Sequence, residues 1–314
     1  MRKSIREAQV EAGRCGDTIR VAAFEGAHLY GESLPLDAAP NTGLDKIGFT
    51  VRQPCGVVLA ITPFNYRSTA VEERVSRTAG VKKLSLELAR PLRWSCCPTP
   101  IWSWLPAPSP WVDANAGQVC ISVQRVIAHP EIEADFLDAL VPKVEAIRTG
   151  DPAAESTVMG TLINAGEAAR VQRMISDAAT AGARLLTGGD RDGATVAPTV
   201  VAGGDPGSPL HQQELFGPAV AVSSAADWES AIAQANGTPY GLSAGVFTSD
   251  VAGAVRAIRE IDAGNVHINW TPLWRADLMP YGGLKGSGYG KEGARRAVAE
   301  MTEEKTIVLH GRPW

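Results

Sequence analysis

The second half of the chain alternates helical and strand patterns, and this alternation limits the folds open to it. Apolar residues recur at helical spacing between Pro130 and Gly150, and a second helical stripe ends at Gly182. The pattern then predicts strands over residues 184–187, 242–248 and 265–269, with helices over 227–236 and 250–260. Strand–helix–strand alternation favours a parallel sheet with helices on its faces. The sequence therefore predicts an α/β fold.

The first half gives a less regular pattern. Residues 2–30 indicate a helix of mixed polarity, and the alternation from Ile47 to Val51 is typical of a strand. Val57 to Ile61 is a short apolar run that resembles a buried strand. Near the other end, Thr306 to His310 predicts a further short strand.

Composition excludes several classes of protein. A formal net charge of −4 and a pI near 5.8 give no basic surface for nucleic acid or an anionic membrane. No apolar run approaches the roughly 20 residues that a membrane-spanning helix needs, and no signal peptide opens the chain. Five cysteines without paired spacing suit a reducing cytoplasm. The pair Cys96-Cys97 lacks metal-ligand spacing, so we expect no metal site.

The segment Asn115–Cys120 is the strongest candidate for chemistry. Its sequence, Asn-Ala-Gly-Gln-Val-Cys, ends on a thiol just before an apolar segment. A flexible Gly117-Gln118 approach would leave the Cys120 sulfur accessible to a substrate. The alternative is a buried structural cysteine, which is the commoner role of a single cysteine.

This segment strongly resembles the nucleophile motif of the aldehyde dehydrogenase superfamily, and other family motifs stand in the family's order. They are Gly56–Asn65, Val81–Leu88, Gly150–Pro152, Glu214–Pro218 and Pro280–Gly288. The resemblance covers most of the chain and is nearly continuous from Asn115 onward. It implies oxidation of an aldehyde to a carboxylic acid with NAD or NADP, on an aldehyde-dehydrogenase-like sheet whose Rossmann-like cofactor part is incomplete.

The resemblance also implies catalytic roles. Cys120 would attack the aldehyde carbon, while the Asn65 amide and the Cys120 backbone N–H stabilise the oxyanion. After hydride transfer to the nicotinamide, Glu87 would activate the water that hydrolyses the thioester. Each role has a plain alternative, because Asn65 also suits a turn and Glu87 also suits the polar face of an alternating strand.

Three further residues match cofactor contacts of the family. Glu214 corresponds to the residue that binds the nicotinamide ribose, Phe216 packs beside it, and Ser68 corresponds to a pyrophosphate contact. Glu214 also suits an ordinary surface carboxylate. Arg275 has two interpretations: it faces a carboxylate- or phosphate-bearing aldehyde, or it forms a structural ion pair with Asp277 or another acid.

The chain departs from the family's pattern directly after Asn65. There the motif containing Ser68 follows at once, whereas the family inserts about two βα units, roughly 70 to 80 residues on that spacing. The missing units would hold the adenosine ribose of the cofactor, and Arg67 replaces a glycine of the family. The family also has nearly a hundred further residues before the equivalent of Arg2. We therefore expect a truncated, internally deleted member.

A second departure covers residues 89–111, which contain four of the eight tryptophans. Prolines so close together disrupt helices and strands alike, so we expect an irregular, poorly packed tract. A change of reading frame explains it best, because the spacing from Glu87 to Cys120 stays close to that of the family.

The expected division is a remnant of the cofactor-binding domain (1–88), an aberrant tract (89–112), a catalytic α/β domain (113–290), and a C-terminal helix and strand (291–314). The resemblance implies homo-oligomers in which a strand near 304–310 pairs with a ribbon near 45–54 of another subunit. Besides a dehydrogenase, two functions remain open: a catalytically dead remnant that keeps a subunit-pairing surface, and a weak Cys120-dependent esterase.

Overall fold

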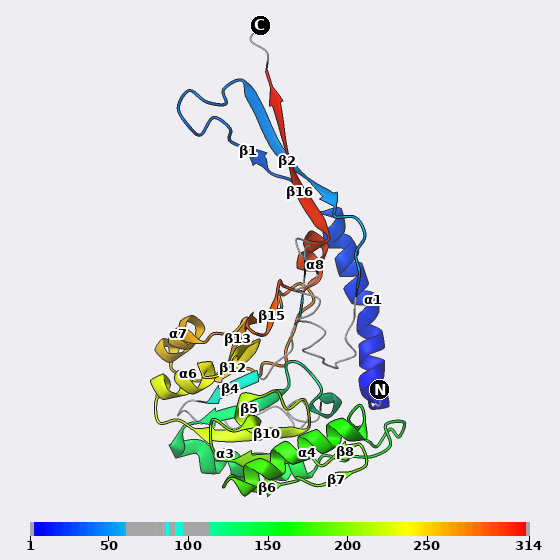
Figure 1. Cartoon of the computed structure of the whole chain (residues 1–314), viewed down its shortest axis with the longest axis vertical. Helices are drawn as coiled ribbons and strands as arrows, with labels where there is room; N and C mark the ends of the chain where they lie inside the picture. Colours follow the sequence, from blue (N-terminus) through cyan, green and yellow to red (C-terminus); the bar gives the residue numbers. More distant parts are fainter. Residues whose placement is uncertain are drawn as a thin grey trace. The chain divides into compact units, whose positions relative to one another are not determined.

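The computed structural model describes residues 3–60, 79, 84, 86–87, 92–96 and 114–311 (Figure 1). The chain divides into two compact units. Unit 1 comprises Met1–Ala12, Phe64–Arg275 and Tyr281–Gly290, and unit 2 comprises Gly13–Pro63, Ala276–Pro280 and Lys291–Trp314. No helix in the described part of the chain is long and apolar enough to cross a membrane.

A seven-stranded sheet in the described residues forms the centre of unit 1. Its order is β13 (Asn265–Ile268), β12 (Ser243–Phe247), β4 (Leu92–Cys96), β5 (Val123–Ala128), β10 (Ala219–Ser224), β9 (Thr199–Ala202) and β6 (Arg184–Thr187). Neighbouring strands are parallel except β6, which runs antiparallel to β9 at one edge. The predicted α/β fold with a mainly parallel sheet is confirmed.

Several helices of unit 1 begin at a residue whose side chain accepts a hydrogen bond from a free N–H group of the first turn. Asn164 accepts from Glu167 N at 2.9 Å, and Asp227 accepts from Ser230 N at 2.7 Å. The helices are α3 (Pro130–Glu145), α4 (Ala165–Thr180), α5 (Pro209–Gln212), α6 (Trp228–Asn236) and α7 (Val251–Glu260). Helix α3 packs on β5, β6 and β9, and α6 packs on β4 and β5. The helices predicted from the apolar stripes are therefore confirmed.

The main core of unit 1 lies between these helices and the sheet. Its fully buried members include Val126 of β5, Phe136 of α3, Ile175 of α4, Val200 of β9 and Val222 of β10. Each such side chain contributes about 1.5–3 kcal/mol of burial free energy. Short elements complete the unit: β3 (Leu86–Glu87), a 3-10 turn (Ala114–Gly117), β7 (Arg191–Asp192), β8 (Thr195–Val196), β11 (Tyr240–Gly241), β14 (Leu284–Lys285) and β15 (Gly288–Tyr289).

A buried arginine links two helix ends to the sheet. Arg125 of β5 donates to the carbonyls of His211 and Gln234, each at 3.3 Å. Burial lowers the pKa of Arg125 to about 10. The pKa of His211 is lowered by burial and by the Arg125 charge, while Asp205 opposes this shift. His211 therefore resists protonation in the folded chain.

We expect unit 1 to lose stability as the pH falls below about 6.5, the pKa of histidine in an unfolded chain. The unfolded chain then binds a proton that folded His211 accepts only at lower pH. The slope per such proton is at most about 1.4 kcal/mol per pH unit. Urea unfolding between pH 5 and 8 should give a shallower fall for His211→Gln. Exposed His310→Gln is the control, and an unchanged slope in His211→Gln contradicts the prediction.

Unit 2 contains most of α1 (Ile5–Ala27), together with β1 (Ser33–Leu34), β2 (Lys46–Pro54), α8 (Ala294–Glu300) and β16 (Thr302–His310). Strand β16 pairs antiparallel with β2 from Thr302↔Pro54 to His310↔Lys46. Both strands were predicted, but the expected pairing with another subunit is wrong for these residues, since they pair within one chain. Ile47 and Leu309 are opposite each other and exposed by 66% and 54%.

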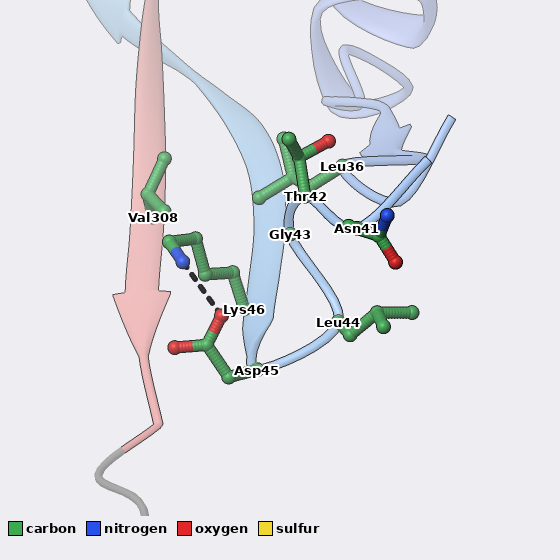
Figure 2. Close-up of a pocket in the computed structure, with 8 residues that line it drawn as sticks. All are labelled: Leu36, Asn41, Thr42, Gly43, Leu44, Asp45, Lys46 and Val308. Carbon is green, nitrogen blue, oxygen red and sulfur yellow. Dashed lines mark hydrogen bonds and ion pairs between the residues drawn. The ribbon is translucent and has the colours of Figure 1, made fainter. Parts of the chain in front are cut away.

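A pocket in unit 2 lies beside this ribbon, where the loop before β2 meets Val308 (Figure 2). Lys46 Nζ lies 2.6 Å from Asp45 Oδ1 at its rim, and this contact lowers the pKa of Asp45. The pocket is lined by Leu36, Asn41, Thr42, Gly43, Leu44, Asp45, Lys46 and Val308. None of the candidate catalytic residues lines it.

Two expectations from the sequence are wrong. Residues 57–60 form no strand, and Val57 and Leu59 are exposed by 102% and 82%; Ile61 lies outside the described residues. Within the tract expected to be irregular, Leu92–Cys96 forms β4 between β5 and β12. Backbone pairing on both sides therefore outweighs the unfavourable composition there. The rest of residues 89–111 lies outside the described part.

Candidate active site

The thiol motif begins with a tight turn in a left-handed backbone. Asn115, Ala116 and Gly117 have φ values of 48°, 54° and 70°, a conformation that costs non-glycine residues about 1–2 kcal/mol each. Two contacts hold it: Glu7 accepts from the Asn115 backbone N–H, and Asn115 Nδ2 donates to the Gln118 carbonyl at 3.2 Å. The turn is thus fixed from both sides.

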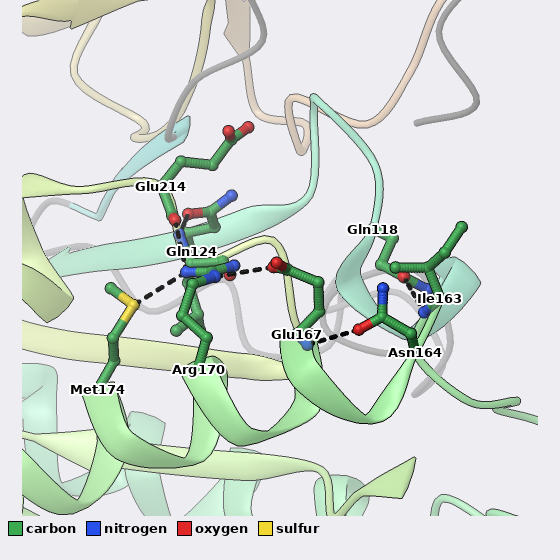
Figure 3. A network of polar contacts seen from close by, with 9 residues as sticks. Gln118, Gln124, Ile163, Asn164, Glu167, Arg170, Met174 and Glu214 are labelled. Carbon is green, nitrogen blue, oxygen red and sulfur yellow. Dashed lines mark hydrogen bonds and ion pairs between the residues drawn. The ribbon is translucent and has the colours of Figure 1, made fainter. Parts of the chain in front are cut away.

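Gln118 has a structural role in this turn (Figure 3). Gln118 is only 7% exposed. Its Nε2 donates to the Asn115 carbonyl at 2.9 Å, and its Oε1 accepts from Ile163 N at 2.8 Å. The expected flexible approach through Gly117-Gln118 is therefore wrong, because buried hydrogen bonds fix the Gln118 amide. Access to the thiol does not depend on these two residues being mobile.

Gly117 brings the thiol motif against the motif Glu214–Pro218. A Cβ atom on Gly117 would lie 2.0 Å from the Gly217 carbonyl oxygen. Only a residue without a side chain permits this approach of two backbones. The structure therefore joins the two motifs that the resemblance assigned to catalysis and to cofactor binding.

Cys120 is half-buried, and its Sγ lies 2.7 Å from the Tyr281 hydroxyl oxygen. Tyr281 is 1% exposed and packs with Ile121 and Leu242. Cys120 therefore sits at the edge of a small apolar cluster, in contact with a polar group. This environment differs from that of a cysteine inside an apolar core.

Arg275 contacts the ring of Tyr281. Its guanidinium carbon is 4.3 Å from the centre of the Tyr281 ring, a cation–π distance. Asp277, one of the acids considered as an ion-pair partner of Arg275, binds Arg14 at 3.0 Å. Arg275 therefore places a positive charge against the same tyrosine whose hydroxyl contacts Cys120.

Arg170 and Gln124 hold the turn that carries Glu214 and Phe216 (Figure 3). Arg170 donates to the Leu215 carbonyl at 2.6 Å and to the Glu214 carbonyl at 3.4 Å. Gln124 Oε1 accepts from Leu215 N at 2.8 Å. Glu167 fixes Arg170 by an ion pair of 2.8 Å. Glu214 and Phe216 are half-buried, and Phe216 has φ 49°.

The remaining predicted site residues are only partly covered. Glu87 lies in β3, and its backbone pairs with Gly288, so the motif Val81–Leu88 meets the motif Pro280–Gly288. Nothing is described of the Glu87 side chain. Asn65 and Ser68 lie outside the described residues. No group of three or more His, Cys, Asp or Glu side chains in the described ranges is arranged to hold a metal ion.

A sequence profile of the aldehyde dehydrogenase family matches residues 1–74 and 111–307. The chain belongs to the aldehyde dehydrogenase family. The profile match omits residues 75–110, which contain Glu87 and most of the tract expected to be aberrant. The profile match therefore includes described helices and strands on both sides of this segment.

Individual aldehyde dehydrogenases resemble the chain along nearly its whole length. The 3-sulfolactaldehyde dehydrogenase of Priestia aryabhattai is 33% identical, over 98% of this chain and 80% of that protein. A lactaldehyde dehydrogenase of Methanococcus maripaludis is 36% identical, over 98% of this chain and 82% of the relative. The first alignment runs over 386 residues, more than the 314 of this chain, so the relative has segments without a counterpart here.

Solved aldehyde dehydrogenase structures have the same fold. The glyceraldehyde-3-phosphate dehydrogenase GapN of Methanocaldococcus jannaschii, complexed with NADP, has a TM-score of 0.90 and 28% identity, over 98% of this chain and 83% of that one. Aldehyde dehydrogenase 21 of Physcomitrella patens, in complex with succinate, has a TM-score of 0.92 and 25% identity, over 98% and 80%.

The sequence alone did not single out three residues of the site: Tyr281, Arg170 and Gln124. Tyr281 had a signal, because it lies within the motif Pro280–Gly288 of the aldehyde dehydrogenases. Arg170 and Gln124 had none, because an arginine on a helix and a glutamine on a strand usually lie on the surface.

Proposed function

We propose that this chain is an aldehyde dehydrogenase by descent that retains the family's thiol site, with Cys120 as the nucleophile. The observation that carries the proposal is the half-buried Cys120 sulfur at the Tyr281 hydroxyl. Reactive thiols need access and a polar partner for the thiolate, and this site offers both. The reaction is the oxidation of a small aldehyde to a carboxylic acid.

In the proposed reaction, the Cys120 thiolate forms a bond to the aldehyde carbon, and the carbonyl electron pair moves onto oxygen. The Cys120 backbone N–H and the Asn65 amide stabilise that oxyanion, each donor contributing about 3–4 kcal/mol in comparable enzymes. Glu87 takes a proton from the water that releases the acid. A bound NAD or NADP supplies the hydride acceptor.

Glu214 and Phe216 are the proposed contacts for the nicotinamide half of the cofactor, with Ser68 for its pyrophosphate. Support comes from the turn itself, because Arg170 and Gln124 hold its backbone in place. The half-buried Glu214 carboxylate is therefore well positioned to accept hydrogen bonds from ribose hydroxyls. Solved aldehyde dehydrogenases similar to this chain include complexes with NADP.

For the substrate, we propose a short aldehyde with an anionic group, received by Arg275. Its charge lies beside Tyr281, the residue in contact with Cys120. Relatives include a 3-sulfolactaldehyde dehydrogenase and an aspartate-semialdehyde dehydrogenase, whose substrates carry such groups. Guanidinium suits carboxylate, sulfonate and phosphate oxygens equally well in geometry.

The ribbon of β2 and β16 is the proposed surface for homo-oligomers, at residues 45–54 and 304–310. Its exposed apolar pair, Ile47 and Leu309, supports this role. A cytoplasmic location, and the division into a cofactor remnant (1–88), an aberrant tract (89–112), a catalytic domain (113–290) and a C-terminal segment (291–314), complete the proposal.

Iodoacetamide labelling followed by mass spectrometry tests the thiol. We expect Cys120 to label about tenfold faster at neutral pH than exposed Cys15 or Cys55, because a polar partner raises the thiolate fraction. NADH formation from aldehyde should remain undetectable, since much of the cofactor surface is missing. An unreactive Cys120 contradicts the retained site, and steady NADH formation contradicts the loss of turnover.

The same samples separate the alternatives. Hydrolysis of p-nitrophenyl acetate that disappears in Cys120→Ser supports a residual esterase. If Cys120 shows no labelling and no hydrolysis while the chain still forms oligomers, the result supports a remnant that keeps only its pairing surface. The control variant is Cys15→Ser, whose thiol is exposed.

A further inference from the structure

The contact between Cys120 and Tyr281 joins a sulfur to the hydroxyl of a buried tyrosine. Tyr281 is 1% exposed, and its ring packs on Ile121 and Leu242. A buried phenol places its hydroxyl on a hydrogen-bonding partner, and here Cys120 Sγ lies 2.7 Å away. A neutral thiol accepts hydrogen bonds weakly, whereas a thiolate is a charged and much better acceptor.

Arg275 adds a positive charge to the same group. Its guanidinium carbon is 4.3 Å from the Tyr281 ring centre, over the face of the ring. A cation there draws electron density from the ring, which makes the phenol a stronger hydrogen-bond donor. All three residues belong to unit 1, so the arrangement lies within one compact body.

We propose that Tyr281 is a catalytic residue that donates its hydroxyl hydrogen to the Cys120 thiolate, and that Arg275 strengthens this donation through the ring. The catalytic role of Tyr281 rests on the proposed function. The phenol keeps its proton throughout: as the sulfur bonds to the aldehyde carbon, the carbonyl electron pair moves to oxygen, and the Tyr281 donation to sulfur weakens.

The proposed function gives the site two carboxylates, Glu87 and Glu214. A carboxylate that approached the sulfur would oppose ionisation of the thiol. Tyr281 and Arg275 act in the opposite direction. Their role is therefore to keep the Cys120 thiolate populated at neutral pH.

The test measures the rate of iodoacetamide labelling at Cys120 from pH 6 to 10. In this reaction the thiolate displaces iodide, so the rate follows the thiolate population without cofactor or turnover. We expect Tyr281→Phe to slow labelling at pH 7 about tenfold, the effect of one hydrogen bond to a charged acceptor. The midpoint of the pH profile should rise by about one unit.

Three further variants make the result specific. Tyr30→Phe removes an exposed phenol hydroxyl and should change nothing at Cys120. Arg275→Met should slow labelling about threefold, and this effect should vanish in the Tyr281→Phe background because Arg275 acts through the hydroxyl. Labelling of exposed Cys15 and Cys55 in each sample reports any general change in reactivity or folding.

Equal or faster labelling in Tyr281→Phe overturns the proposal, since the hydroxyl is then only a packing partner or holds the thiol neutral. If Tyr281→Phe does not fold, an unchanged pH midpoint in Arg275→Met overturns it instead. Failure of the proposed function has a different signature: Cys120 in the unmodified chain labels no faster than Cys15 at any pH.

Discussion

Titration of the chain with NAD or NADP is expected to show affinity at least about a hundredfold weaker than that of an intact relative, a loss of roughly 2.7 kcal/mol. The expected reason is the direct junction of Asn65 to the motif containing Ser68, which leaves out the segment that holds the adenosine ribose in the family. The contacts proposed for the turn of Glu214 and Phe216 serve only the nicotinamide half.

Isothermal titration calorimetry measures this directly, with the 3-sulfolactaldehyde dehydrogenase of Priestia aryabhattai as the intact control. Glu214→Gln in this chain should have little binding left to weaken. Micromolar binding of either nucleotide by this chain contradicts the prediction and makes the missing segment dispensable.

Gly117→Ala is expected to destabilise unit 1 by about 2–5 kcal/mol. The left-handed φ of 70° accounts for about 1–2 kcal/mol of this cost. Overlap of the new Cβ with the Gly217 carbonyl oxygen, at 2.0 Å, adds about 1–3 kcal/mol. Because the overlap is with backbone, no side-chain rotation relieves it.

Gly193→Ala is the matched control for this substitution. Gly193 also has a left-handed φ, 56°, but a Cβ there meets nothing within 4 Å. Urea unfolding followed by far-UV circular dichroism should therefore show a much smaller loss for Gly193→Ala. Equal losses in the two variants contradict the close packing of the thiol and Glu214 turns.

Helix boundaries were predictable wherever the cause is local. Asn164 and Asp227 accept from the first N–H groups of α4 and α6, and Gly182 follows α4 with φ 101°. Such signals need only a few neighbouring residues. The thiol motif and the Glu214 motif were also recognisable, and the structure brings their backbones together.

Features that depend on distant partners escaped prediction. Strand β4 lies in a Trp- and Pro-rich tract, and only pairing with β5 and β12 makes it a strand. Gln118 looked like a flexible approach until the loop around Ile163 supplied its hydrogen-bond partner. Val57 to Ile61 looked like a buried strand because an apolar run does not specify what covers it.

The pairing of β2 with β16 joins residues 46–54 to residues 302–310. During synthesis, β2 leaves the ribosome long before its partner exists, and its strand edge stays open for most of translation. Exposed Ile47 lies on that strand, so the nascent chain carries an apolar, unpaired edge of the kind that recruits other strands. The fold of unit 2 can therefore be completed only after the whole of unit 1 has been synthesised.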